Sequence, residues 1–124
     1  MKRIIVDIDD TLTIHHSADE YSSKDVRLDI VSKLKEYKNL GYEVILYSAR
    51  NMKTHNGDLS KINKYTLPIL LEWLDNNNIE YDGIIMGKPW CGNMGFYLDD
   101  KAIRPDEFLR MTEEEIHKLI GNIK

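Results

Sequence analysis

Hydrophobic residues follow two different patterns along the chain, and the alternation of these patterns predicts an α/β fold. Residues 2–8 contain a near-continuous run of isoleucine and valine, which is typical of a strand buried on both faces. Across residues 26–40 the apolar positions instead recur at helical spacing, and Gly41 follows where a helix commonly ends. Residues 42–47 form a second apolar run and therefore a second predicted strand.

Amphipathic helices and short apolar strands continue to alternate in the second half of the chain. A helix is predicted over residues 67–77, with Thr66 as its N-cap and Pro68 tolerated in its first turn. The other predicted elements are a helical segment over 59–65, strands over 82–86 and 95–98, and a last helix between Thr112 and Gly121. The order β-α-β-α-β-β-α predicts a single-domain, Rossmann-like open parallel sheet flanked by helices over residues 1–124.

Composition places the chain among ordinary globular proteins and excludes several classes. Its 124 residues are 42% hydrophobic and 31% charged, which is not the balance of a disordered chain. The net charge of −4 offers no basic excess for nucleic acid or anionic lipid. No apolar stretch approaches the roughly 20 residues of a membrane span or the apolar core of a secretion signal, so we expect a cytoplasmic protein. The single cysteine, Cys91, excludes an intrachain disulfide and a cysteine zinc site.

Polar and charged residues follow each predicted strand, at the sheet edge where α/β proteins bind ligands. They are Asp7, Asp9 and Asp10 after the first strand, Ser48, Ala49 and Arg50 after the second, Gly87 and Lys88 after the third, and Asp99 and Asp100 after the fourth. Four of these five carboxylates, meeting one lysine, would repel each other strongly and require a cation. Oxygen ligands of this kind are typical of Mg²⁺, which completes its shell with water and substrate phosphate.

The same segments resemble, in order, the four signatures of the haloacid dehalogenase (HAD) superfamily. IIVDIDDTLT is similar to the first, a strand followed by Asp-x-Asp-x-Thr, and LYSAR is similar to the second, a strand that ends in Ser or Thr. GKP carries the lysine of the third, and GFYLDDKAIRP carries the paired acids of the fourth. Each signature alone is weak, but four in this order at four strand ends, over residues 4–105, form a specific pattern.

The resemblance implies a phosphatase mechanism. Asp7 would be the nucleophile that attacks phosphorus to give an aspartyl-phosphate. Asp9 would protonate the leaving oxygen and then take a proton from the hydrolytic water. Ser48 would hydrogen-bond a phosphoryl oxygen, and Lys88 would neutralise charge on the nucleophile and the transferring group. The presence of Asp9 favours phosphoryl chemistry over halide displacement, because a departing halide needs no proton.

The resemblance also implies Mg²⁺ as the cofactor. Its ligands would be the carboxylate of Asp7, the backbone carbonyl of Asp9 and the acidic pair Asp99–Asp100. The sequence leaves the order within that pair open, and we favour Asp100 as the direct ligand and Asp99 as the water-mediated or orienting one.

The gaps between the signatures are too short for the cap domain that larger members of the superfamily insert. The first gap, residues 13–25, has room only for a flap, whose residues 14–21 would hang over the site. The chain therefore resembles the capless branch. RNMKTHNG and GKPWCGNMGFYLDDKAIRPDEF also resemble small phosphatases of capsule and surface-polysaccharide biosynthesis. That likeness implies a phosphorylated sugar or polyol as substrate, with Arg50 and Asn51 as candidate binding residues.

Other functions stay open at this point. The substrate could be a nucleotide or a macromolecule, because capless members of the superfamily act on all of these. A signalling receiver domain is disfavoured, since no Asp ends the second predicted strand and the paired acids come after Lys88 instead of before it. A fold kept only as a binding module is disfavoured by the intact set of Asp7, Asp9, Ser48 and Lys88. An open site can also be closed by a neighbouring subunit, so we consider a homodimer or homotetramer.

Overall fold

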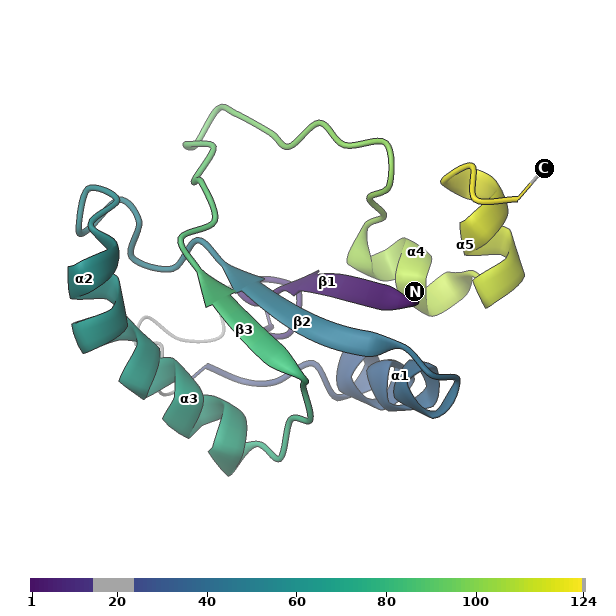
Figure 1. Ribbon diagram of the computed structural model, residues 1–124, viewed down its shortest axis with the longest axis horizontal. Helices are drawn as coiled ribbons and strands as arrows, with labels where there is room; N and C mark the ends of the chain where they lie inside the picture. Colours follow the sequence, from purple (N-terminus) through teal and green to yellow (C-terminus); the bar gives the residue numbers. More distant parts are fainter. Residues whose placement is uncertain (15–23, 124) are drawn as a thin grey trace. The chain divides into compact units, whose positions relative to one another are not determined.

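The structure, a computed structural model, describes residues 1–14 and 24–123 and contains two compact units, Met1–Trp90 and Cys91–Lys124. In chain order the N-terminal unit contains β1 (Arg3–Asp7), α1 (Leu28–Asn39), β2 (Glu43–Ser48), α2 (Leu59–Lys61), the π-helical segment η2 (Ile62–Thr66), α3 (Leu67–Asn76) and β3 (Gly83–Met86) (Figure 1). The C-terminal unit contains α4 (Pro105–Arg110) and α5 (Glu113–Leu119). Within the described ranges, every helix is too short or too polar to cross a membrane.

The three strands form an open parallel sheet in the order β1-β2-β3. Val6 lies opposite Leu46, and Leu46 lies opposite Ile84. Each crossover leads to the next strand in the same direction, so right-handed connections place α1 and α3 on the same face of the sheet. Both helices lie below the strands in the view of Figure 1. The predicted α/β class with a parallel sheet is therefore confirmed.

The core of the N-terminal unit lies between this face of the sheet and the two helices. Its fully or nearly fully buried apolar side chains include Val6, Val44 and Leu46 from the strands, Ile30 and Leu34 from α1, and Leu70 and Leu74 from α3. Ile5 and Ile85 point to the opposite face and are each 54% exposed. The prediction that the first strand is buried on both faces is therefore wrong at Ile5, because both crossover helices cover the other side.

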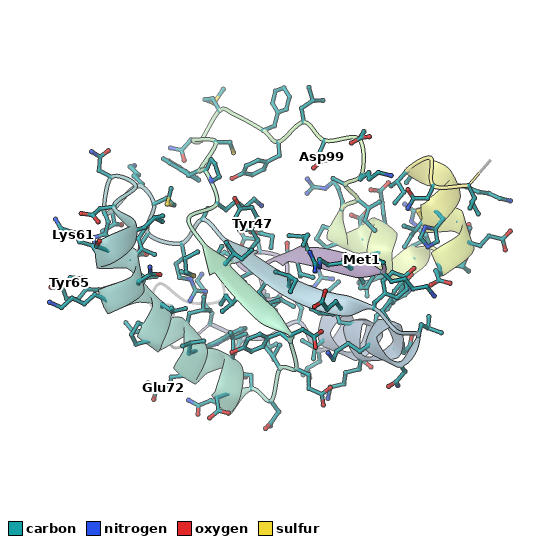
Figure 2. The ribbon with its side chains drawn as sticks, in the orientation of Figure 1. Met1, Tyr47, Lys61, Tyr65, Glu72 and Asp99 are labelled. Atoms are coloured by element: carbon teal, nitrogen blue, oxygen red, sulfur yellow. The ribbon has the colours of Figure 1, made fainter. Side chains whose placement is uncertain are left out.

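The two helical segments predicted over 59–65 and 67–77 form one continuous helical run, Leu59–Asn76, with η2 in its middle. Thr66 stands at the predicted N-cap position of α3, but it has helical backbone angles and makes no side-chain capping bond, so it does not start a separate helix. Pro68 explains the irregular backbone at this point, because it has no N–H with which to bond the preceding turn of the helix. The wider turn of η2 directly before it adapts the run to this residue. Figure 2 shows Lys61 and Tyr65 pointing away from the sheet.

The C-terminal unit differs from prediction at one strand and one helix. Residues 95–98, predicted as the fourth strand, pair with no strand in the described part of the chain. The chain turns tightly just before them, since a Cβ added at Gly95 would lie 2.0 Å from the carbonyl oxygen of Cys91. Where only a turn was expected near Pro105, α4 forms, with Glu107 Oε1 accepting the N–H of Arg104 at 2.9 Å. The helix predicted after Thr112 is confirmed as α5.

Candidate active site

The loop after β1 is held by backbone hydrogen bonds and by buried apolar side chains. The carbonyl of Ile8 accepts the N–H groups of Thr11, Leu12 and Thr13 at 3.2, 2.8 and 3.1 Å. The side chains of Ile8 and Leu12 are completely buried. Asp10 has a φ of 63°, a left-handed conformation that Asp adopts more readily than most residues, and its N–H donates to Thr13 Oγ1 at 2.8 Å. The two carboxylates on either side of Ile8 in sequence therefore stand on a firmly anchored loop.

Asp7 ends β1 and contacts a cation from a distant part of the chain. Lys88 Nζ lies 3.5 Å from Asp7 Oδ1, although the two residues are 81 positions apart. The Thr11 hydroxyl donates to Asp7 Oδ2 at 3.3 Å, which braces the loop against the carboxylate. Burial raises the pKa of Asp7 above its ordinary value, Lys88 opposes this effect, and the neighbouring charge of Asp9 adds to it. Asp7 is thus a partly desolvated carboxylate that faces one ammonium group.

Lys88 reaches Asp7 because of the turn that follows β3. Gly87 has a φ of 91°, a backbone conformation that favours glycine, and a Cβ at this position would lie 2.6 Å from Leu59 Cδ2, so that side chain would have to move. The N–H of Lys88 then donates to the carbonyl of Ser48 at 3.0 Å. This bond ties the end of β3 to the end of β2. The predicted convergence of the strand ends is therefore present within the N-terminal unit for Asp7, Ser48 and Lys88.

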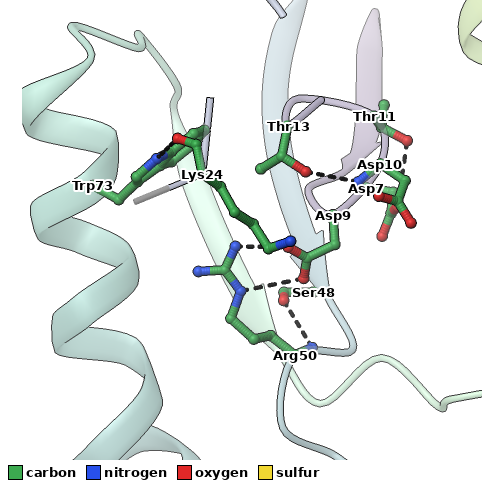
Figure 3. A network of polar contacts seen from close by, with 9 residues as sticks. All are labelled: Asp7, Asp9, Asp10, Thr11, Thr13, Lys24, Ser48, Arg50 and Trp73. Atoms are coloured by element: carbon green, nitrogen blue, oxygen red, sulfur yellow. Dashed lines mark hydrogen bonds and ion pairs between the residues drawn. The ribbon is translucent and has the colours of Figure 1, made fainter. Parts of the chain in front are cut away.

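Asp9 is held by Arg50 in a two-point ion pair (Figure 3). Arg50 Nη2 donates to Asp9 Oδ1 at 2.8 Å, and Arg50 Nε donates to Asp9 Oδ2 at 3.2 Å. The Arg50 side chain is 1% exposed, whereas that of Asp9 is 31% exposed. The guanidinium therefore lies beneath the carboxylate, on the protein side of the site.

Ser48 and Asn51 flank this arginine in sequence. Ser48 is the last residue of β2, is buried, and accepts the N–H of Arg50 on its Oγ at 3.0 Å. Asn51 has a φ of 60°, and its carbonyl accepts the N–H of His55 at 3.0 Å, which starts the turn after the site. The contact of Ser48 with phosphate and that of Asn51 with substrate stay predictions.

The charge balance within the N-terminal unit differs from the one expected from sequence. Asp7 pairs with Lys88 and Asp9 pairs with Arg50, so two cations face two carboxylates. Asp99 and Asp100 belong to the C-terminal unit, where Asp99 Oδ1 accepts the N–H of Lys101 at 2.8 Å. The prediction of a single cation at the site is therefore wrong, because Arg50 is a second one. Across the described residues, no three His, Cys, Asp or Glu side chains gather as a metal site, and the assignment of Asp99 and Asp100 as ligands stays a prediction.

A hollow of about 440 Å³ follows the site along the chain. It is lined by Met52, Lys53, Asn56, Gly57, Pro89 and Trp90. Lys53 Nζ lies 5.4 Å from the centre of the Trp90 ring. The lining thus combines an aromatic ring, a cation and an amide. Its first residue in sequence lies two positions after Arg50, and its last lies two positions after Lys88. The predicted flap over residues 14–21 falls mostly outside the described residues.

The raised pKa of Asp7 predicts a stability change for Asp7→Asn. A carboxyl whose pKa is raised on folding stabilises the protein at acidic pH, and this contribution is lost as the pH rises from the ordinary value of 3.8 through the raised value. Asp7→Asn should therefore be more stable than the wild type at neutral pH, and this advantage should disappear near pH 4. Urea unfolding in metal-free buffer across this range tests the sign. A variant that is less stable at neutral pH would contradict it.

One residue of the site, Thr13, and one ion pair, between Arg50 and Asp9, were missed in the sequence. Thr13, whose buried hydroxyl holds the loop at Asp10, carried no signal beyond its place in the first signature. The pairing of Arg50 with Asp9 was missed as well. In the structure Val44, Leu46 and Ser48 are the buried residues of β2, and Arg50, two residues further on, is also buried. A buried arginine requires an acidic partner, but this burial shows only in the structure, because residues 42–47 form an apolar run in the sequence.

Comparison with known proteins gives a structural relative over the full length of the chain. No family model matches the chain, and no curated protein matches it. A crystal structure of a structural genomics target from Vibrio cholerae is similar to the chain, with 50% identity, complete coverage of both chains and a TM-score of 0.94. The chain therefore belongs to the same family as this Vibrio cholerae protein.

Proposed function

We propose that the chain is a Mg²⁺-dependent phosphomonoester hydrolase that acts through an aspartyl-phosphate on Asp7. The observation that carries this proposal is the contact between Asp7 and Lys88, at the end of β1 and just after β3. A partly desolvated carboxylate beside an ammonium group suits attack on phosphorus, because the cation offsets the charge of both partners. The resemblance to the HAD superfamily, with four signatures in order, supports the same reaction.

The proposed reaction has two steps, and both use side chains of this site. First, an Asp7 oxygen bonds to phosphorus while the bond from phosphorus to the leaving oxygen breaks, and Asp9 gives a proton to that oxygen. Second, water attacks the same phosphorus, Asp9 takes a proton from it, and phosphate leaves as the Asp7 carboxylate is restored. Lys88 neutralises negative charge beside Asp7 in both steps. Ser48 is the proposed donor to a phosphoryl oxygen.

The residues around Asp7 suit a magnesium ion. The Asp7 carboxylate and the backbone carbonyl of Asp9 are hard oxygen donors, and Mg²⁺ commonly takes one or two such protein ligands with water and phosphate. The burial that raises the pKa of Asp7 also favours a nearby cation. Bound Mg²⁺ would supply charge neutralisation and orientation of a phosphoryl oxygen. Asp100, with Asp99 as its helper, is the proposed further ligand.

We assign the hollow, whose lining residues follow Arg50 and Lys88 in sequence, to the leaving group of the substrate. Its size lies within the range of small-molecule sites. The face of Trp90 can pack against the C–H groups of a sugar ring, while Lys53 and Asn56 can bond its hydroxyl or acidic groups. A phosphorylated sugar or a related polyol phosphate therefore suits the lining.

Replacing Trp90 by Ala should raise KM for the best sugar phosphate by about tenfold and leave kcat nearly unchanged, because the ring binds substrate and transition state alike. Steady-state kinetics with that substrate test this expectation. Tyr65→Ala is the matched control, since Tyr65 is an exposed aromatic residue on the outer side of the helical run. An unchanged KM in Trp90→Ala, or an equal change in both variants, would contradict the assignment of the hollow.

The proposed function is tested by release of inorganic phosphate in the presence of Mg²⁺. The substrates are para-nitrophenyl phosphate and a panel of sugar, polyol and nucleotide monophosphates. Turnover that favours one sugar or polyol phosphate would support the proposal and name the substrate. A preference for nucleotides would keep the reaction and overturn the substrate class. No release from any compound, by protein shown to bind Mg²⁺, would overturn the small-molecule phosphatase.

A further inference from the structure

We infer that Arg50 is a positioning residue that acts through Asp9, and that it does not contact substrate itself. The inference rests on the proposed function, because it concerns how the acid of that reaction is held. Arg50 lies two residues after the end of β2, and it was proposed from the sequence as a substrate-binding residue. Its contacts and its burial support a different role.

The first support is the geometry of the ion pair. Arg50 Nε and Nη2 bond the two oxygens of Asp9 at 3.2 and 2.8 Å, although the residues are 41 positions apart. A planar guanidinium that meets both oxygens fixes the rotation of the carboxylate as well as its position. The arginine backbone is held too, since its N–H donates to Ser48 Oγ at 3.0 Å. Asp9 is therefore fixed from β2, in addition to the anchored loop that carries it.

The second support is the direction from which the arginine approaches. With its side chain 1% exposed, Arg50 offers almost no surface to a ligand, while the 31% exposure of Asp9 keeps part of the carboxylate open. A carboxylate has about four lone-pair positions, and the two-point pair uses two of them. The remaining positions on the open side can carry the proton to the leaving oxygen. Arg50 thus orients the acid without blocking its transfer.

Loss of this positioning should depend on how much the leaving group needs a proton. Para-nitrophenyl phosphate and phenyl phosphate have nearly the same shape, but phenoxide is the more basic leaving group and gains more from protonation. In Arg50→Gln, kcat/KM should fall at least about tenfold more for phenyl phosphate than for para-nitrophenyl phosphate. The ratio kcat/KM is the correct measure, because it reports the steps up to departure of the leaving group and excludes hydrolysis of the aspartyl-phosphate.

Four further variants, one of them a double variant, make the test specific. Asp9→Asn should show the same selective loss, and adding Arg50→Gln to it should cause little further change, because both act through one carboxylate. Arg50→Lys keeps the positive charge without the two-point geometry. Its selective loss of kcat/KM for phenyl phosphate should therefore be smaller than that of Arg50→Gln. Arg3→Gln is the matched control, since it removes an exposed arginine–carboxylate pair with Glu43 and should leave the ratio of the two substrates unchanged.

The outcomes separate this inference from the proposed function. A selective loss that disappears in the Asp9→Asn background supports the inference. Equal losses with both phosphates in Arg50→Gln and Arg50→Lys, or an increase confined to KM, would overturn it and leave the phosphatase intact. Absence of turnover in the wild type would overturn the proposed function, and this inference with it. If Arg50→Gln does not fold, Arg50→Lys carries the same comparison.

Discussion

Replacing Asp7 by Asn should reduce phosphate release at least about ten-thousand-fold, since removal of a covalent nucleophile has effects of this order. The amide of Asn does not form the bond to phosphorus that the Asp7 carboxylate is proposed to form. The change is nearly isosteric, and the partly desolvated site should favour the neutral side chain, so the fold should be kept. Continuous assay of phosphate release, with thermal unfolding of the same sample, measures both effects.

Asp10→Asn is the matched control for that experiment. It makes the same chemical change three residues further along the same loop. Asn readily adopts the left-handed backbone conformation of Asp10. The hydrogen bond from the backbone N–H of Asp10 to Thr13 Oγ1 does not involve the changed group. This variant should keep most of its activity. Substantial turnover by folded Asp7→Asn would contradict the role of Asp7 as nucleophile.

Removing Mg²⁺ with EDTA should reduce turnover at least about a thousandfold, because charge stabilisation by a metal ion contributes several kcal/mol. A phosphate dianion would otherwise approach two neighbouring carboxylates, those of Asp7 and Asp9. Added Mg²⁺ should restore activity. Ca²⁺ should bind without restoring it, since Ca²⁺ needs longer bonds and more ligands than Mg²⁺. Assays with metal-free protein and defined additions measure this.

Binding can be separated from turnover by thermal unfolding. Mg²⁺ should raise the Tm of the wild type, because a ligand that binds the folded state stabilises it, and should raise it less in Asp7→Asn. Asp100→Asn should also weaken this effect, and more than Asp99→Asn, if Asp100 is the direct ligand. Full activity in EDTA would contradict the metal-dependent mechanism. An equal Tm shift in Asp7→Asn would contradict Asp7 as a ligand.

The strands of the N-terminal unit could be predicted from the sequence, because their apolar runs are easy to recognise. The apolar runs over 2–8, 42–47 and 82–86 appear as β1 (Arg3–Asp7), β2 (Glu43–Ser48) and β3 (Gly83–Met86). Strand ends in such a sheet share one edge, which is why Asp7 and Lys88 could be placed together across 81 positions.

The segments that could not be predicted depend on contacts more than on local pattern. Residues 95–98 have the composition of a strand, but a strand exists only with a partner, and composition does not supply one. The helix α4 is six residues long and buries one side chain, Phe108, so it has no helical periodicity to detect. The π-helical turn before Pro68 lets the helix continue through a residue that has no backbone N–H. In the sequence, that proline predicts only an interruption between two helices.

At the candidate site, the sequence did not predict the direction of the Arg50 side chain. Arg50 follows a strand end, so its side chain can point toward the opening of the site or toward the core. We predicted that it points toward the opening, because a substrate-binding role requires this. The structure places Arg50 toward the core, against Asp9. An apolar run does not show which face of a strand is the more deeply buried, so this direction could not be predicted from the sequence.

The central claim is that phosphate is transferred to Asp7, and trapping that intermediate tests it most directly. Wild-type protein turning over para-nitrophenyl phosphate with Mg²⁺ is quenched in acid, reduced with borohydride and digested, and the peptide that contains Asp7 is sequenced by mass spectrometry. Borohydride converts an aspartyl-phosphate to homoserine, so we expect homoserine at position 7 in the wild type and unmodified residues in Asp7→Asn. Turnover without any modified aspartate, or with the mark at Asp9 instead, would contradict the account.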